Sequence, residues 1–231
     1  MLKKRLRSLK VAFQHSRQTP APTILKSILL TAVCFCCFKP GAKAQAQKYS
    51  FDQRILMNMM ESRCAGTTKV MQGISDYTQE ISFLVPATVA VIGLIDNNKT
   101  TLQKSLYLAE SAAAATFITY GMKYSFKRSR PYIKNPDLIA TGSGNSPSFP
   151  SGHTSVAFST ATSLYLAYPK WYVAVPAFAY AASVGYSRMY LGMHYPSDVL
   201  AGAVIGAGSA WLMYKANKWL FKKKPVLKPE M

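Results

Sequence analysis

Six apolar stretches of 15 to 18 residues, separated by polar and basic segments, restrict the possible folds of this chain more than any other feature. They are residues 24–38, 81–95, 105–122, 153–168, 171–187 and 198–214. A membrane-spanning helix needs about 20 apolar residues, and about 17 suffice with flanking help, so each stretch is slightly short. Trp171 and Trp211, near the ends of two stretches, are typical of interfacial aromatics that extend a span. The pattern predicts an all-α bundle of about six helices, and it favours membrane spans over the buried helices of a soluble bundle.

The composition narrows the class of protein further. The 231 residues include 28 Lys and Arg against 9 Asp and Glu, a net charge of +19, with 49% apolar residues and 4 cysteines. The apolar content excludes a disordered basic protein, and the cysteines are too few for a disulfide-built miniprotein. The mean hydropathy is only +0.05 because the basic segments offset the apolar ones. The charge indicates an anionic partner, which is nucleic acid, acidic lipid or phosphate.

Basic residues are concentrated at the two ends of the chain, next to apolar stretches. Residues 1–23 carry six cations and no acid, and the segment after Tyr214 carries six lysines and one glutamate. Six spans place both ends on one face, which the positive-inside rule assigns to the cytoplasm. Residues 39–80, 123–152 and 188–197 then lie outside. Nucleic-acid binding is the alternative, but no recognition-helix or aromatic-stacking pattern supports it.

Four regions are expected along the chain, namely residues 1–46, 47–80, 81–215 and 216–231. The first is a secretory signal peptide or an uncleaved first span, since a basic segment and an apolar core precede A-x-A sequences. The second is an external amphipathic segment, the third is the helical core and the fourth is a basic cytoplasmic tail. We therefore expect a bacterial inner-membrane protein whose site faces the periplasm. A soluble periplasmic protein, released by signal-peptide cleavage, is the alternative.

Gly202 and Gly206 form a G-x-x-x-G pattern on the last apolar stretch. Small residues at this spacing let two helix backbones approach closely. We expect them to pack against another helix of the same bundle rather than to form a dimer interface.

A first cluster of polar residues lies between Lys123 and Lys134, at the outer end of an apolar stretch. Five cations occur there, and the nearest acid is Asp137. Cations on the outer face run against the positive-inside trend, which indicates a bound anion. The planar fork of Arg130 suits phosphate oxygens, and Lys123 supplies a point charge. We assign this cluster to phosphate.

A second cluster opens the fourth apolar stretch with Ser151, Gly152 and His153, directly after Pro150. Ser151 is a preferred N-cap, and Gly152 allows a ligand to approach the backbone closely. The free N–H groups at a helix N-terminus bind anions. For this segment alone, an ordinary helix cap with a hydrogen-bonded histidine is an alternative of equal weight.

A third cluster joins the last two apolar stretches and contains Arg188, His194 and Asp198. Asp198 follows His194 by four residues, near the start of a helix that Pro196 can initiate. This spacing allows the carboxylate to bond one imidazole nitrogen and leave the other free as a nucleophile. An aspartate at a helix start is more often a simple cap, so this interpretation depends on the neighbouring clusters.

Together the three clusters resemble the type 2 phosphatidic acid phosphatase superfamily, which also includes vanadium-dependent haloperoxidases and bacterial acid phosphatases. Its sequence blocks K-x6-R-P, P-S-G-H and S-R-x5-H-x3-D are all matched, in order and without a departure. The matching residues are Lys123, Arg130, Pro131, Pro150, Ser151, Gly152, His153, Ser187, Arg188, His194 and Asp198.

The resemblance implies a role for each matched side chain. His194 would attack phosphorus in line and form a phosphohistidine, Asp198 would orient His194, and His153 would protonate the leaving oxygen and then activate water. The non-bridging oxygens would be held by Lys123, Arg130, Ser151, the Gly152 N–H and Arg188. Phosphoryl transfer needs this positioning and charge neutralisation. No metal or other cofactor is expected, since the sequence has neither H-E-x-x-H nor a carboxylate cluster with metal-ligand spacing.

The resemblance implies a phosphatase but does not select its substrate. If the helices span a membrane, the expected partners are the membrane and a phosphorylated lipid. The candidates are undecaprenyl diphosphate, phosphatidic acid, phosphatidylglycerol phosphate and lipid A phosphate. The alternatives are a soluble exported acid phosphatase for small phosphomonoesters, a haloperoxidase, a non-catalytic lipid-phosphate binder and, as another class, a nucleic-acid-binding protein. The sequence does not indicate an oligomeric state.

Overall fold

The computed structural model describes residues 49–142 and 144–220, and every structural statement below concerns these residues. The chain divides into two compact units, residues 1–46 and 47–231, and the described residues all belong to the second. The apolar stretch 24–38, with its expected signal peptide or first span, lies outside the described residues.

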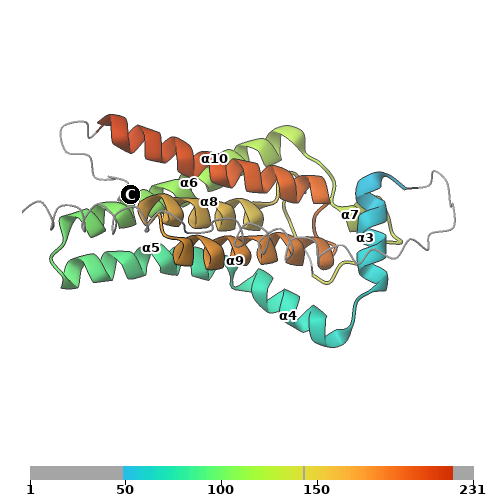
Figure 1. The fold of residues 1–231 in the computed structure, drawn as a ribbon. Coiled ribbons are helices and arrows are strands. Elements are labelled where there is room, and N and C mark those ends of the chain that lie inside the picture. The colour runs from blue at the N-terminus through green and yellow to red at the C-terminus, as the bar shows by residue number, and fades with distance from the viewer. Residues whose placement is uncertain (1–48, 143, 221–231) are drawn as a thin grey trace, which may run out of the picture. The chain divides into compact units, whose positions relative to one another are not determined.

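The described part of the chain is all-helical, as the sequence predicts (Figure 1). Its elements are α3 (Phe51–Glu61), α4 (Ala65–Asp76), α5 (Thr78–Ile95), α6 (Lys99–Phe126), α7 (Pro131–Lys134), α8 (Gly152–Ala167), α9 (Trp171–Tyr190) and α10 (Pro196–Leu220). Five of the six apolar stretches are thus confirmed as helices, namely α5, α6, α8, α9 and α10.

Most of these helices extend beyond their apolar stretch because polar residues cap or continue them. At the start of α6, the Asn98 side-chain oxygen accepts hydrogen bonds from the N–H groups of Thr100 (3.0 Å) and Thr101 (3.2 Å). The helix therefore begins six residues before the apolar stretch. At its other end, α6 continues past Lys123, which brings that side chain to the tip of the bundle.

Helix α8 is central and packs against α5, α6, α9 and α10. Its contact with α10 is unusually close because two glycines face it. A Cβ atom at Gly202 would lie 2.6 Å from the carbonyl oxygen of Ser151, and one at Gly206 would collide with the carbonyl of Ser155. The expected use of the G-x-x-x-G pattern for packing within the bundle is confirmed.

The interior of the bundle holds small and hydroxylated side chains, whereas large apolar side chains cover the outside. Buried hydroxyls such as those of Ser111 and Ser209 donate to carbonyls of their own helix, which satisfies them without a partner helix. Phe83 is 75% exposed and Phe117 is 83% exposed. An apolar exterior around a polar, small-residue interior is the distribution expected of helices in lipid rather than in water.

The helices are not the six equal membrane spans that the apolar stretches suggest, because they differ in length and composition. In the described residues, α5 and α10 are long and apolar enough to cross a membrane. Helix α8 has only 16 residues, or about 24 Å at about 1.5 Å per residue, less than the hydrocarbon core of about 30 Å. Its buried position among four other helices explains why it can be shorter.

The segment expected as one amphipathic region, residues 47–80, folds as α3, α4 and the start of α5. Helix α3 opens with a capping box formed by Ser50 and Gln53, and it lies across the end of the bundle at which α10 begins (Figure 1). Its buried Leu56 packs with Leu138 and Tyr195. This segment therefore packs against the helical bundle.

Candidate active site

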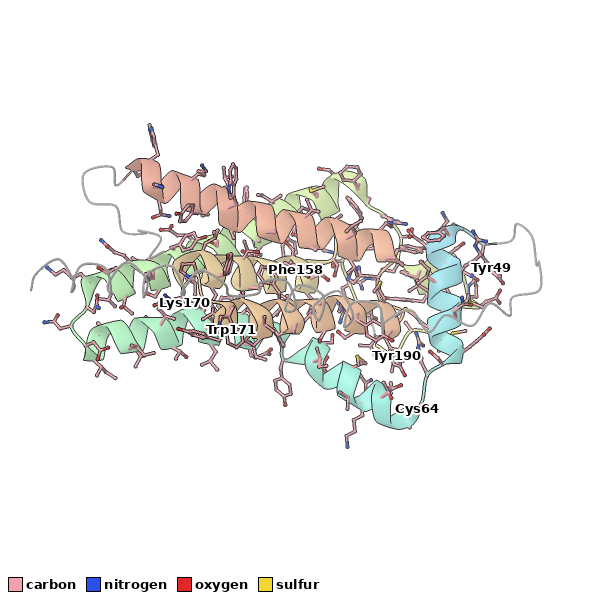
Figure 2. All side chains as sticks on the ribbon, viewed as in Figure 1. Tyr49, Cys64, Phe158, Lys170, Trp171 and Tyr190 are labelled. Carbon is pink, nitrogen blue, oxygen red and sulfur yellow. The ribbon has the colours of Figure 1, made fainter. Side chains whose placement is uncertain are left out.

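The eight site residues predicted from the sequence lie at one end of the bundle, where α6 and α9 end and α8 and α10 begin. This is the Tyr190 end of α9, opposite the end marked by Lys170 and Trp171 (Figure 2). A polar cavity of about 100 Å³ is found there. It is lined by Lys123, Arg130, Gly152, His153 and His194, together with Gln79, Thr116, Thr119, Tyr120, Ser146 and Val156. The other three predicted residues, Ser151, Arg188 and Asp198, are buried.

His194 lies in the loop between α9 and α10 and is only 1% exposed. Its Nδ1 lies 3.6 Å from Oδ2 of Asp198 and 3.4 Å from the hydroxyl oxygen of Ser148. The same Oδ2 accepts hydrogen bonds from the Ser148 hydroxyl (2.5 Å) and the Tyr195 N–H (3.0 Å). His194 and Asp198 face each other as expected, but the 3.6 Å between Nδ1 and Oδ2 is longer than a hydrogen bond.

Three cations of the predicted phosphate site, Lys123, Arg130 and Arg188, are buried. Lys123 donates to the carbonyl of Pro147, and Nε of Arg130 donates to the carbonyl of Ser146 at 2.9 Å. None of the three forms an ion pair with a described carboxylate. Buried charges are costly unless they are compensated, so this concentration of positive charge is suited to an anion.

Arg188 provides a second sign of anion binding. Its Nη1 donates to the hydroxyl of Ser75 on α4, whereas its buried Nε has no hydrogen-bond partner among the described residues. A guanidinium with one side anchored and another donor unused can present that donor to a phosphate oxygen.

The structure divides the Lys123–Lys134 cluster between two environments. Of its five cations, only Lys123 and Arg130 line the polar cavity. Arg128 instead pairs with Asp52 and Asp198. Helix α6 ends at this point, with Lys127 in the left-handed conformation, so the chain direction changes between Lys123 and Arg128.

Ser151 occupies the expected N-cap position of α8, but its side chain makes no capping hydrogen bond. Its hydroxyl oxygen accepts from the Thr154 hydroxyl at 2.9 Å. A Cβ at Gly152 would lie 3.8 Å or more from its protein neighbours, which is ordinary contact. The protein itself therefore does not require glycine there, and close approach of a ligand remains a prediction.

Sequence reasoning assigned no role to Ser148 or Ser75, although both touch site residues. Ser148 is fully buried and bonds Asp198, and Ser75 anchors Arg188 from a different helix. Ser148 stands two residues before Pro150, beside the predicted anion site, so the sequence alone could have marked it as a candidate site residue. Nothing in the sequence marks Ser75 in this way, because only the packing of α4 on α9 brings it near Arg188.

His194 is expected to stay neutral throughout the pH range in which phosphatases are assayed. Burial lowers its pKa to about 4; the contact with Asp198 opposes this shift, and the charges of Arg188, Arg130 and Lys123 reinforce it. Because the pKa is lowered, the neutral and nucleophilic form prevails above about pH 4. NMR titration of the histidine side chains, with the resonance assigned by its loss in His194→Ala, should show a midpoint near 4. A midpoint at 6 or above would contradict this assignment.

Comparison with known proteins identifies similar sequences and folds. Residues 104–222 match the family model described as the PAP2 superfamily. An undecaprenyl-diphosphatase from Sulfolobus acidocaldarius is 28% identical over 167 residues, which cover 72% of this chain and 78% of that protein. A lipid A 1-phosphatase from Porphyromonas gingivalis is 29% identical over 168 residues, which cover 71% of this chain but only 35% of that protein.

Among solved structures, a transmembrane PAP2 type phosphatidylglycerolphosphate phosphatase from Bacillus subtilis has the same fold. Its TM-score is 0.61 at 24% sequence identity, and the match covers 78% of this chain and 87% of that chain. The predicted all-α bundle with a phosphatase-like core is confirmed.

Proposed function

Because this chain belongs to the PAP2 superfamily and is a phosphatase, we propose that it removes phosphate from a phosphorylated lipid through a phosphohistidine intermediate on His194. The observation that carries the lipid assignment is an apolar groove continuous with the polar cavity. The names of the similar proteins, which act on undecaprenyl diphosphate, lipid A and phosphatidylglycerol phosphate, support the same substrate class.

The proposed reaction follows from which nitrogen of His194 is occupied. Nδ1 faces Asp198 and Ser148, so Nε2 is left to attack phosphorus. As the P–N bond forms, the bond to the leaving oxygen breaks, and His153 protonates that oxygen. Water, deprotonated by His153, then hydrolyses the phosphohistidine and releases inorganic phosphate.

The same cations would stabilise charge in both steps. Lys123, Arg130 and Arg188, with the Gly152 N–H and Ser151 at the start of α8, would bind the non-bridging oxygens. Their burial excludes water, which strengthens each of these interactions.

The apolar groove lies between α5 and α6 and has a volume of about 590 Å³. Its lining includes Phe83, Pro86, Ala109, Ala113 and Phe117. Four residues line both the groove and the polar cavity, namely Gln79, Thr116, Tyr120 and Val156. A molecule with its phosphate beside His194 can therefore place an apolar chain against α5 and α6.

Filling this groove should separate lipid substrates from soluble ones. Ala113→Trp places a large ring where the lipid chain would lie, and an apolar contact between substrate and pocket is worth roughly 1–3 kcal/mol, or about 10- to 200-fold. We expect kcat/KM for phosphatidic acid and undecaprenyl diphosphate in detergent to fall by at least about 10-fold. Hydrolysis of p-nitrophenyl phosphate should stay within about twofold, because this small ester does not reach the groove.

Ala182→Trp, at an exposed alanine of α9, is the matched control and should change neither activity. Equal loss on both substrate types in Ala113→Trp would contradict a role of the groove. Phosphate release by the wild type from soluble esters only would favour the exported acid phosphatase instead.

We also propose how the protein is oriented in the membrane. The site lies on the bundle end opposite the start of α9, and the basic segments at both chain ends are expected in the cytoplasm. We therefore place the protein in a bacterial inner membrane with its site facing the periplasm.

A further inference from the structure

The carboxylate of Asp198 is bound on both of its oxygens, by two different sets of partners. Oδ2 faces Nδ1 of His194 and accepts from Ser148 and the Tyr195 N–H. Oδ1 accepts a hydrogen bond from Nη1 of Arg128 at 2.5 Å. The orientation of the carboxylate toward His194 therefore depends in part on a residue that does not line the polar cavity.

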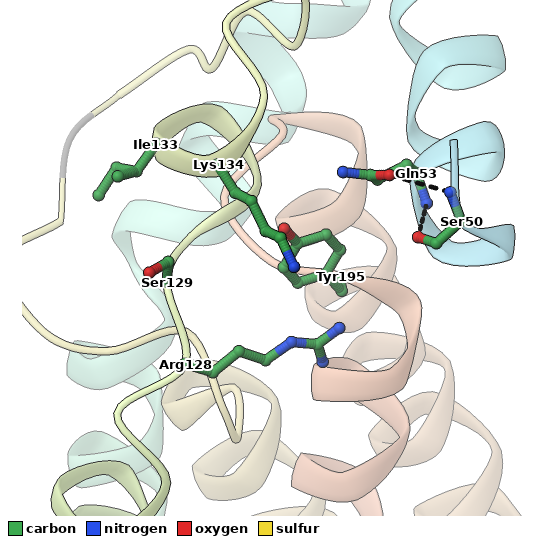
Figure 3. Close-up of a pocket in the computed structure, with 7 residues that line it drawn as sticks. All are labelled: Ser50, Gln53, Arg128, Ser129, Ile133, Lys134 and Tyr195. Atoms are coloured by element: carbon green, nitrogen blue, oxygen red, sulfur yellow. Dashed lines mark hydrogen bonds between the residues drawn. The ribbon is translucent and has the colours of Figure 1, made fainter. Parts of the chain in front are cut away.

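Arg128 is itself held from three sides. Its Nη2 lies 3.0 Å from Oδ2 of Asp52 on α3, and its Nη1 donates to the Ser197 hydroxyl at 2.8 Å. The centre of its guanidinium lies 4.0 Å from the centre of the Tyr195 ring. Figure 3 shows Arg128 extending from the segment after α6 toward the first turn of α10, below Tyr195.

Asp52 also contacts the first turn of α10 directly, because its carboxylate accepts a hydrogen bond from the Ser197 hydroxyl. Ser197 directly precedes Asp198. Helix α3 is thus connected by one carboxylate to both Arg128 and the backbone turn that carries Asp198. Asp52 lies outside residues 104–222, which match the family.

An exposed ion pair usually contributes little, and Arg128 is one-third exposed. This pair differs because Asp198 is fully buried and adjoins the proposed nucleophile. The terminal torsion of an aspartate is broad, so a carboxylate with one free oxygen can rotate. At 3.6 Å from Nδ1, a small rotation decides whether Oδ2 makes the hydrogen bond to His194.

We propose that Arg128, held in place by Asp52, is a positioning residue that fixes the Asp198 carboxylate and, through it, the His194 imidazole. The inference depends on the proposed roles of His194 and Asp198. Helix α3 then has a function in catalysis, since its first turn anchors the arginine that orients the histidine–aspartate pair.

Arg128→Gln tests the proposal, because it removes the charge and the guanidinium but keeps a polar side chain. Misplacement of a reacting group by about 1 Å costs about 10²-fold, so we expect kcat to fall by about 10- to 100-fold with KM within twofold. The amount of phosphohistidine formed in a single turnover, trapped by an alkaline quench, should fall in step. Arg128→Lys should recover most of kcat, because an ammonium can still bind Oδ1.

Asp52→Asn is the second variant and carries the test if Arg128→Gln does not fold. We expect a smaller loss of kcat, about 3- to 10-fold, because Arg128 keeps its contact with Asp198. The double variant should be no slower than Arg128→Gln alone, since Asp52 acts through Arg128. Arg54→Gln, on the exposed face of α3, is the matched control and should leave kcat unchanged.

Three results would overturn the inference. They are a wild-type kcat in Arg128→Gln, a rise in KM with kcat intact, and an equal loss in Arg54→Gln. If Arg128→Gln does not fold, a wild-type kcat in Asp52→Asn overturns it. Failure of the wild-type protein to release phosphate from any substrate would instead contradict the proposed function, so the two failures are distinguishable.

Discussion

Replacing His194 with alanine is expected to reduce phosphate release by at least about 10⁴-fold, because the variant lacks the nucleophile that forms the phosphoenzyme. The reduction should be the same for lipid and soluble substrates, since both share the step at phosphorus. Measurements of phosphate release in detergent, combined with trapping of labelled phosphohistidine, should show that turnover and the labelled intermediate disappear together.

A loss of folding must be separated from a loss of chemistry. His194 is buried and contacts Ser148 and Asp198, so its removal also alters packing. The melting temperature of His194→Ala and its binding of inorganic phosphate, measured by calorimetry, provide the control. Phosphate binding should remain near wild type because the cations are intact, and a cooperative melting transition should show that the variant is folded. Wild-type turnover in a folded His194→Ala protein would disprove the mechanism.

Replacing His153 with alanine should have the second-largest effect, and the effect should depend on the leaving group. A general acid contributes about 10²- to 10⁴-fold, so hydrolysis of a lipid phosphate with a poor leaving group should slow by that factor. p-Nitrophenolate leaves without needing a proton, so phosphoenzyme formation from p-nitrophenyl phosphate should slow by less than about 10-fold. Burst kinetics separate this first step from the hydrolysis that follows.

This contrast distinguishes acid catalysis from phosphate binding by His153. His153 lines the polar cavity beside Gly152, so its loss could also weaken substrate binding. In that case the burst rate for both substrates would fall by the same factor and KM would rise. Equal losses on good and poor leaving groups would therefore refute the acid role while leaving the role of His194 untouched.

The sequence was sufficient to predict the helices and the clustering of the site because both depend on local patterns. Apolar stretches of 15 to 18 residues predicted the ends of α5, α6, α8, α9 and α10 to within six residues. Lys123 and His153 stand at the ends of such stretches, and His194 lies in the short segment between the last two. Helices that span the same layer bring their ends together, so these residues were expected to meet, and they line one cavity.

What the sequence could not provide was the direction of individual side chains. Arg128 and Arg130 are two residues apart and chemically identical, yet one pairs with Asp198 and the other lines the polar cavity. The difference arises where α6 ends and the chain turns. The contribution of α3 and α4 to the site could not be predicted from the sequence either, because only long-range packing brings Asp52 and Ser75 to the site.

The glycine contact between α8 and α10 has a consequence for how such an enzyme can diversify. The N–H of Ser151 donates to the carbonyl of Asp198 at 3.0 Å, and Gly202 presses α10 against the same turn of α8. The first turns of α8 and α10 are thus held in contact with each other. The proposed catalytic side chains, His153, His194 and Asp198, lie in or next to these two turns. The residues that line the apolar groove belong to α5 and α6, apart from Val156 of α8. Substitutions there can change which lipid is accepted while the reacting groups keep their geometry.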